Sequence, residues 1–560
     1  YIDGTIVMSE GSSIITKGME SHAVFSMGEI FLTPGKEDRG AITIEAKGEE
    51  AYALFAGGGG IFSSLDGTLD SGCRFNITGD MVTEEDGAIA LRMLKGSVFN
   101  GKTTQNDGYI DLTMVDSLWN ISGSSTMRDL TLCGSTVDFR EAALGTTLTV
   151  NDLRTIDNSA TFFMKVDFAN MINDKVYITG SQEGNAHFIA VRNDGSQTTN
   201  GSEILRLVYT TKNNDDKLSF SLGGDSLSSQ VVEVGGFRYR LAKLEVDEND
   251  NVILPEGHGL APMAGNAYDV NWVLMANGQA ATAASASINT FAGSYLLGYA
   301  ENQTLLQRLG ALPANDASYG IWAKGYSGRF DSSGSDFLSG YGLKYSGLQT
   351  GLDYKLSLDG LYNSAYIGAM LGYVKGNINY DTGRGSVDMK TFGLYGTYTG
   401  DCGLYADLVL KYNWMKNDFK VIDSQNQYVT GQNMDTGGLG ASLEVGRRFN
   451  FDDDQANGGV YLEPQAQLSY SHPNGGTFKA SNGLNVEVAS YNSLLGRLGL
   501  NAGYEIKNEE SKVNIYLKGS FVNEFEGDVK ARLNGAEIKE SFGDRWFVYG
   551  AGANLQLADR

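Results

Sequence analysis

Alternating apolar and polar residues fill the C-terminal part of the chain, from about residue 319 to residue 560. In the clearest stretch every second residue is apolar or aromatic: Leu404, Ala406, Leu408, Leu410, Tyr412 and Trp414. The residues between them include Asp407, Lys411 and Asn413. A period of two is that of a β-strand, whose side chains point alternately to opposite faces. The C-terminal part is therefore expected to form strands with one apolar and one polar face.

The polar faces of these strands carry charged side chains. The alternation recurs in residues 461–470 and 497–505, where the polar set includes Glu463, Arg497 and Glu505. An unpaired carboxylate or guanidinium is costly to bury inside a soluble sheet, whereas the interior of a membrane barrel is wet. The pattern predicts an antiparallel transmembrane β-barrel with about ten strands before Arg560. Six charged residues are expected in its lumen: Lys324, Asp407, Lys411, Glu444, Glu463 and Arg497.

Short apolar runs broken by Gly, Asn, Asp and Ser make up the first 140 residues. Residues 18–25 (GMESHAVF) return as residues 48–55 (GEEAYALF), and more faintly as residues 88–91 (AIAL). Short strands at such a period, with no helical pattern between them, are typical of a parallel β-helix in which each coil buries the apolar face of its neighbour. An antiparallel sandwich is the alternative.

Dense strand-like runs continue from residue 110 to residue 274 and are typical of the capped end of the same solenoid. The composition then changes, because residues 279–287 are almost entirely Ala, Ser and Thr. Larger residues follow at roughly helical spacing and end before Pro313. This spacing predicts a helix whose small-residue front half fits inside a narrow tube, and it contains Ile288, Phe291, Glu301 and Arg308. A flexible Ala/Ser linker is the alternative.

Composition excludes several classes of function. The 560 residues include 67 Asp and Glu against 43 Lys and Arg, and the formal charge of −24 argues against nucleic-acid binding. The 3 cysteines and 4 histidines lie far apart and show no metal-ligand spacing. The segment GDSL around Ser226 is similar to an esterase block, but no Asp-x-x-His partner accompanies it. A polar turn is the better interpretation, and we expect no catalytic, cofactor or metal site.

Taken in order, these features resemble a classical autotransporter of the type V secretion family of Gram-negative bacteria, with a pertactin-like passenger. The resemblance rests on the repeats at Gly18 and Gly48, residues 118–132 and 148–167, the strand of Trp272, the helix ending at residues 305–310 and the strands from Trp322. It implies an all-β protein in which a parallel β-helix is followed by a linker helix and an antiparallel transmembrane barrel.

The resemblance also implies a division into four parts. Residues 1–140 are passenger repeats, 141–276 the C-terminal autochaperone segment of the passenger, 277–312 the linker and pore-spanning helix, and 313–560 the translocator barrel. Trp119 and Trp272 are expected to be packing residues of the passenger. The family barrel has roughly twelve strands, an even number that closes without an edge. The native gene is therefore expected to continue for about two more strands.

The function that the resemblance implies is export and anchoring of a surface passenger by its own barrel. Folding of the passenger outside the cell drives export, because burial of apolar surface makes backsliding unfavourable. The passenger is expected to be a non-enzymatic adhesin or host-contact protein. The implied partners are outer-membrane lipid, the barrel-assembly machinery, periplasmic chaperones and an unknown extracellular or host ligand.

Two alternatives stay open at this point. One is an autotransporter whose hydrolytic passenger lay upstream, and the other is an outer-membrane channel with a large extracellular domain. Some family members cut themselves at an Asn-Asn pair in the pore helix. No such pair occurs between Ala276 and Gly310, so release by that route is not expected.

Overall fold

The computed structural model describes residues 6–557 apart from 10, 34–39, 65–71, 158, 185–186, 211–218, 224–229, 246–269, 303–318, 358–363, 401, 452–457, 508–510 and 542–544. The chain divides into two compact units. One comprises Tyr1–Gly278 with Ser424–Asn426, and the other comprises Gln279–Asp423 with Gln427–Arg560.

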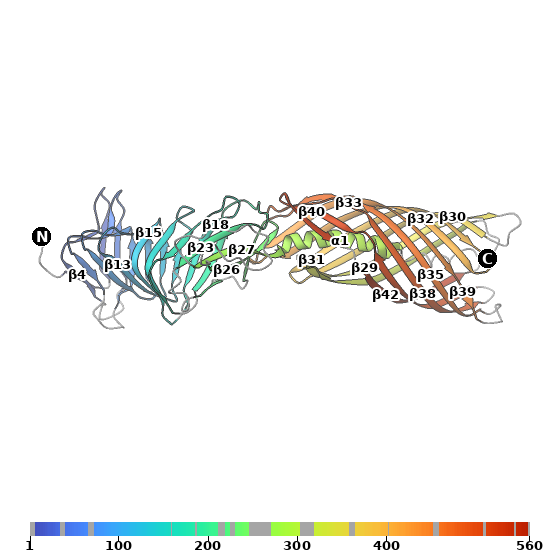
Figure 1. The fold of residues 1–560 in the computed structure, drawn as a ribbon, viewed down its shortest axis with the longest axis horizontal. Coiled ribbons are helices and arrows are strands. Elements are labelled where there is room, and N and C mark those ends of the chain that lie inside the picture. Colours follow the sequence, from blue (N-terminus) through green and yellow to red (C-terminus); the bar gives the residue numbers. More distant parts are fainter. Residues whose placement is uncertain are drawn as a thin grey trace. The chain divides into compact units, whose positions relative to one another are not determined.

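The first unit is a parallel β-helix of stacked coils (Figure 1). Its first sheet has the order β1 (Ile6–Ser9), β4 (Glu29–Thr33), β7 (Ile61–Ser63), β10 (Ala88–Met93), β13 (Tyr109–Val115), β15 (Ser125–Cys133), β17 (Thr147–Thr155), β20 (Lys175–Ile178) and β23 (Ile204–Thr210), with β21 (Gln182–Glu183) beside β17. The antiparallel strands β27 (Val270–Ala280), β26 (Phe237–Glu245) and β25 (Val231–Val234) complete this sheet. The antiparallel sandwich is therefore the wrong alternative.

Two further parallel sheets form the other faces of the solenoid. The second has the order β2 (Ser13–Thr16), β5 (Ile42–Ala46), β8 (Phe75–Thr78), β11 (Val98–Gly101), β14 (Leu118–Ile121), β16 (Thr136–Asp138), β18 (Thr161–Asp167), β22 (His187–Asn193) and β24 (Phe220–Leu222), with β19 (Ile172–Asn173) beside β18. The third joins β3 (Val24–Ser26), β6 (Tyr52–Ala56), β9 (Asp80–Thr83) and β12 (Thr103–Gln105). The first two sheets continue without a break across residue 140.

The sequence repeat corresponds to one coil of the β-helix. Phe25 pairs in register with Phe55, and their rings stack with centroids 4.8 Å apart. A Cβ atom at Gly48 would lie 1.7 Å from the carbonyl oxygen of Gly18, so only glycine fits there. The faint third copy, residues 88–91, is a wrong prediction: it lies in β10 of the first sheet. Phe55 pairs instead with Val82 of β9. Alternating small and apolar residues occur on every face of a solenoid, so a match as short as residues 88–91 does not identify the sheet to which it belongs.

Large apolar side chains fill the interior of the coils. Those fully buried include Phe62, Phe75, Phe99, Trp119, Phe139 and Phe162. Trp119 stacks on Phe99 with ring centroids 5.4 Å apart, and its indole nitrogen donates a 2.9 Å hydrogen bond to the Gly101 carbonyl. Trp272 differs from the expectation, because it is only partly buried in β27, where it meets the ring of Phe220 edge-on.

The second unit is a curled antiparallel sheet in which each strand pairs with the next. The order is β28 (Tyr319–Gly334), β29 (Ser339–Ser357), β30 (Ser364–Tyr380), β31 (Gly383–Thr399), β32 (Leu404–Ile422), β33 (Tyr428–Arg447), β35 (Gly458–Pro473), β38 (Ser493–Lys507), β39 (Ser511–Glu524) and β42 (Arg545–Leu557), with β34 (Phe449–Asn450) beside β35. A separate sheet has the order β36 (Gly476–Lys479), β37 (Asn485–Val488), β40 (Asp528–Leu533) and β41 (Ala536–Ser541). The only helix among the described residues, α1 (Thr282–Asn302), lies within the ring of barrel strands (Figure 1).

The two faces of the barrel strands separate as the alternation predicts. In β32, Leu408 and Leu410 are 49% and 53% exposed, whereas the alternate residues Asp407 and Val409 are 1% and 4% exposed. The outward face is therefore apolar, and the inward face is enclosed. Within the described part of the chain, no helix has the length and apolar character needed to cross a membrane.

A buried histidine makes the stability of the β-helix depend on pH. His187 is fully buried beside Phe162 and Phe220, and burial lowers its pKa to about 4. Because the unfolded chain protonates this residue near pH 6.5, its contribution is present above that pH and is lost as pH falls towards 4. The loss amounts to about 3 kcal/mol by pH 4.

Urea unfolding of the β-helix in the full chain, followed by protease resistance, checks this dependence. His187→Gln should flatten the fall in stability between pH 6.5 and pH 4. An equal fall in stability with pH for the wild type and His187→Gln would show that His187 is not the source of the pH dependence.

Candidate functional site: the helix inside the barrel

Small and hydroxyl-bearing residues make α1 a helix that can be enclosed. Nearly all of its side chains are buried, including Ser287 and Thr290. Their hydroxyl groups donate hydrogen bonds of 2.5 and 2.7 Å to the backbone carbonyls of Ala283 and Ala286, one turn earlier. These bonds satisfy polar groups that would otherwise be stranded away from water. The flexible-linker alternative is therefore wrong for residues 282–302.

The front of α1 is tied to the turn between β28 and β29. The Ala280 amide donates a 2.8 Å hydrogen bond to the Phe337 carbonyl. The Ser339 amide donates to Ser285 Oγ at 2.9 Å, and Asn289 Nδ2 donates to the Ser339 carbonyl at 2.7 Å. Both backbone groups of Ser339 are thus held by side chains of the helix. This arrangement fixes the start of α1 against one end of the barrel wall.

The middle of α1 bonds to four more wall strands. Thr290 Oγ1 lies 2.6 Å from Tyr380 Oη of β30, and Ser294 Oγ donates to Asn417 Oδ1 of β32 at 2.6 Å. The hydroxyl of Tyr295 donates to the Glu524 carboxylate of β39. Ser493 Oγ of β38 lies 3.1 Å from the Tyr295 hydroxyl and 2.5 Å from the same carboxylate. Contacts on opposite sides of the wall restrain both rotation and sliding of the helix.

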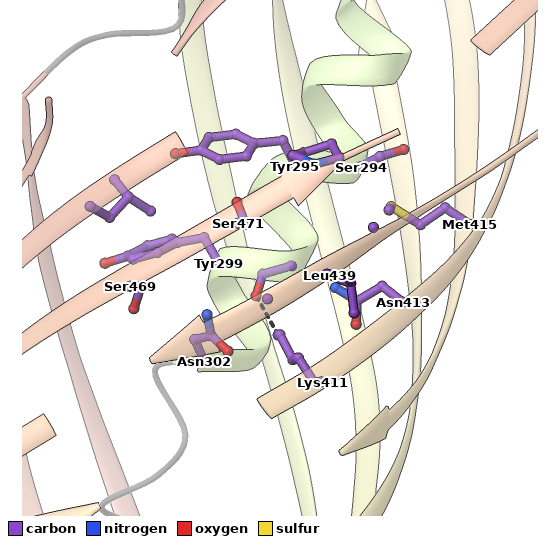
Figure 2. Close-up of a pocket in the computed structure, with 15 residues that line it drawn as sticks. Ser294, Tyr295, Tyr299, Asn302, Lys411, Asn413, Met415, Leu439, Ser469 and Ser471 are labelled. Carbon is purple, nitrogen blue, oxygen red and sulfur yellow. Dashed lines mark hydrogen bonds between the residues drawn. The ribbon is translucent and has the colours of Figure 1, made fainter. Parts of the chain in front are cut away.

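An enclosed ion pair holds the last turn of α1. Lys411 Nζ of β32 lies 3.0 Å from Glu301 Oε2, and the two side chains are 3% and 1% exposed. Lys411 also donates to the Gly298 carbonyl at 2.9 Å, and Thr391 Oγ1 donates to Glu301 at 2.8 Å. A Cβ atom at Gly372 would lie 2.3 Å from Glu301 Oε1, so this glycine of β30 leaves room for the carboxylate. Figure 2 shows Lys411 reaching the helix.

Little space remains around this ion pair. The cavity drawn in Figure 2, between α1 and strands β32, β33, β35 and β38, has a volume of about 30 Å³. That volume holds a water molecule or two and excludes a polypeptide. A wider cavity of about 390 Å³ lies between α1, β28 and β42, beside Ala292 and Leu296. The barrel is therefore tightly filled at the level of Lys411 and looser beside the middle of the helix.

A second charged network lies on the inner wall. Arg497 Nη2 is 2.6 Å from Glu444 Oε2, and the two side chains are 4% and 0% exposed. Tyr405 Oη donates to the other oxygen of Glu444 at 3.0 Å. Asp407 accepts a hydrogen bond from Thr397. These groups form paired lumen lining, and their arrangement offers no nucleophile with an adjacent base.

The structure places the sequence-predicted residues as follows. Ile288 and Phe291 are 1% and 2% exposed on the enclosed helix, and Glu463 is 4% exposed on the inner wall. Lys324 is only partly buried, with its Nζ 5.7 Å from the ring centre of Tyr326. Arg308 and the Ser226 segment lie outside the described residues. No group of three His, Cys, Asp or Glu side chains that could hold a metal occurs in the described ranges.

Sequence reasoning missed the hydroxyl and amide residues that position the helix: Ser285, Asn289, Thr290, Ser294 and Tyr295. A signal existed in the spacing of four between Ser285 and Asn289 and between Thr290 and Ser294, which places each pair on one face of a helix. Their partners in the barrel wall are too distant in sequence for that signal to identify them.

Known proteins share both the barrel and the β-helix. Residues 321–560 match the family model of the autotransporter beta-domain, and residues 127–253 match that of pertactin. The chain belongs to the autotransporter family. Its barrel lies in the outer membrane, and its pertactin-like passenger lies at the cell surface or is secreted.

Individual relatives carry the same family name. The probable autotransporter YcgV of Escherichia coli K12 is 36% identical over 86% of this chain and 51% of its own length. Pertactin autotransporter of Bordetella bronchiseptica is 30% identical, over 76% and 47% respectively. The solved beta domain of the Bordetella autotransporter BrkA is 28% identical, with a TM-score of 0.34, over 43% of this chain and 100% of that structure. The chain spans about half the length of these curated relatives.

The enclosed ion pair provides a test of the helix position. Lys411→Met should leave the Glu301 carboxylate buried without its cation, and Glu301→Gln should leave Lys411 without its anion. Each single change is expected to destabilise the folded barrel by about 3–5 kcal/mol, and the double variant by much less. The heat-induced unfolding shift of the barrel on gels measures the effect.

Arg329→Met is the matched control, because the Arg329–Asp331 pair is shorter, at 2.6 Å against 3.0 Å, but exposed on both sides. It should change the transition little. Equal effects of Lys411→Met and Arg329→Met, or additive effects in the double variant, would show that the helix does not depend on this pair.

Proposed function

We propose that the barrel exports the β-helix and then anchors it at the cell surface, with α1 as the last segment to enter and the one that stays. The observation that carries this proposal is the enclosed Glu301–Lys411 pair at the end of α1. One residue, Ala281, separates α1 from β27, the last strand of the passenger. The passenger is therefore covalently joined to a helix that the barrel holds.

Folding of the passenger supplies the driving force for this export. The C-terminal strands form an apolar cluster of Ile204, Ala242, Leu244, Val273 and Met275. Each fully buried side chain of this kind contributes about 1.5–3 kcal/mol. The antiparallel pairings of β23 with β27 and of β25 with β26, with β26 next to β27 in the sheet, give a folded end on which preceding coils stack. Once stacked, a coil has to unfold before it can re-enter the pore.

We further propose that the displayed passenger is an adhesin or host-contact protein rather than a hydrolase. One relative is named autotransporter adhesin/invasin TibA, from an Escherichia coli O78:H11 strain, and is 26% identical over 92% of this chain. Two further relatives, each 24% identical, are named as serine proteases. The proposed partners are outer-membrane lipid, the barrel-assembly machinery, periplasmic chaperones and an extracellular or host ligand.

An open channel is a weaker alternative. A channel needs a continuous water-filled path, but α1 fills the barrel around Lys411, where the cavity beside the helix has a volume of about 30 Å³. The hydrogen bonds from α1 to strands on several sides of the wall make it a fixed plug. This geometry supports an anchor after export better than it supports a permanent pore.

Surface display tests whether folding of the C-terminal end supports export. Leu244 is 2% exposed, so Leu244→Asp should disrupt the cluster and reduce the passenger on intact cells, while the barrel still reaches the outer membrane. Lys243→Asp, at the neighbouring exposed position of β26, should leave display unchanged. Antibody labelling and protease digestion of intact cells measure display. Normal display of a protease-resistant Leu244→Asp passenger would overturn the proposal.

A further inference from the structure

A surface groove of about 450 Å³ crosses successive coils of the passenger, where the first sheet turns into the second. It is lined along its length by the first residues of β11, β14 and β16 and by the turns that precede them. None of these residues belongs to the barrel or its helix. The groove therefore has no part in export or anchoring as described above.

The floor of the groove repeats from coil to coil. Val98 pairs in register with Leu118, and Leu118 with Thr136, and all three side chains are partly buried on the outer face. Neighbouring strands lie about 4.8 Å apart, so the floor offers a similar small, mostly apolar surface at that interval along the solenoid. A linear ligand built from similar units fits such a floor better than a compact one.

One side of the groove carries a carboxylate. The turn residues Gly96, Asp116 and Gly134 line it, and the two glycines have no side chain to block entry. The Asp116 side chain is 43% exposed, and its ion pair with the exposed Lys95 is long, at 3.9 Å. This carboxylate is therefore available to accept hydrogen bonds from a ligand.

The far end of the groove carries a guanidinium in a fixed orientation. Arg140 donates to Asp138 through Nε at 2.9 Å and through Nη2 at 2.6 Å. Its guanidinium lies 4.2 Å from the ring centre of Phe163, and its side chain is still 42% exposed. Stacking and bidentate pairing hold the guanidinium in place beside the groove, and Asp138 balances its charge.

Charge and backbone pairing limit the ligands that fit. Nucleic acids and acidic polymers are disfavoured, because Asp116 is anionic and Asp138 already neutralises Arg140. An extended peptide would need a free strand edge, but β11, β14 and β16 are each paired on both sides. The groove therefore suits a ligand with apolar faces, neutral hydroxyl edges and a repeating unit.

We propose that this groove binds a neutral linear oligosaccharide, an inference that rests on the proposed role of the passenger in surface contact. Sugar rings lie over Val98, Leu118 and Thr136, and their hydroxyl groups bond to Asp116 and to the Asp138–Arg140 pair. The chain of sugars runs along the solenoid axis, across the coils.

Titration calorimetry on the full chain in detergent tests the proposal with cellohexaose, chitohexaose and maltohexaose as neutral probes and oligogalacturonate as an acidic one. At least one neutral probe should bind, and oligogalacturonate should bind more weakly. Asp116→Asn and Arg140→Met should each weaken the binding roughly tenfold or more, as loss of a charged hydrogen bond does. Arg154→Met is the matched control, because Arg154 is 44% exposed and paired with Asp152 on another sheet.

The outcomes separate this proposal from the one it rests on. Absence of binding to all three neutral probes, tighter binding of oligogalacturonate, or equal losses in Arg154→Met would overturn the groove assignment. Adherence of cells that display the chain is measured in parallel on host-cell monolayers. If cells carrying Asp116→Asn or Arg140→Met still adhere, the groove is not the surface that mediates adherence, and the adhesin role itself stands. Glycan binding by the purified chain without any adherence would instead count against the adhesin role.

Discussion

Polar groups enclosed in a narrow tube must find partners inside it, and this requirement governs the relation between α1 and the barrel. The Glu301–Lys411 pair is almost completely removed from solvent, where a lone charge would cost several kcal/mol. Thr391 and the Gly298 carbonyl complete the bonding of the two charged groups. Gly372 provides the space for the carboxylate. The position of the helix is therefore fixed by the wall, because the buried polar groups of each find their hydrogen-bond and charge partners on the other.

The passenger follows a different rule, because its interior is apolar and its contacts are made between successive coils. The stacking of Phe99 on Trp119 and the close approach of Gly48 to Gly18 each join one coil to the next. Such a structure can grow from one end as chain becomes available. None of the three cysteines, Cys73, Cys133 and Cys402, forms a disulfide bond, so the described fold depends on packing.

Much of this architecture could be predicted from the sequence, because it follows from local geometry. The period of two in β32 correctly separates exposed Leu408 from buried Asp407. The match of residues 18–25 with residues 48–55 correctly identifies one coil. Both signals require only neighbouring residues or a direct repeat.

The remaining features depend on partners that are distant in sequence. The partly buried position of Trp272 is set by the antiparallel strands that close the first sheet. The contacts of Ser285 and Asn289 with Ser339 depend on where the β28–β29 turn meets the helix. The four-stranded sheet of β36, β37, β40 and β41 joins two hairpins separated by β38 and β39. No local sequence pattern predicts these contacts between distant segments.

The most direct test of the account is whether α1 lies in the barrel of the displayed protein. Ser294 Oγ and Asn417 Oδ1 are 2.6 Å apart, so Ser294→Cys combined with Asn417→Cys should place two thiols close enough to be joined by a short thiol–thiol cross-linker on intact cells. Mass spectrometry of peptides from the outer-membrane fraction should find residue 294 joined to residue 417 in most displayed molecules. Full surface display of the passenger with no such cross-link would contradict the claim that the helix remains in the pore.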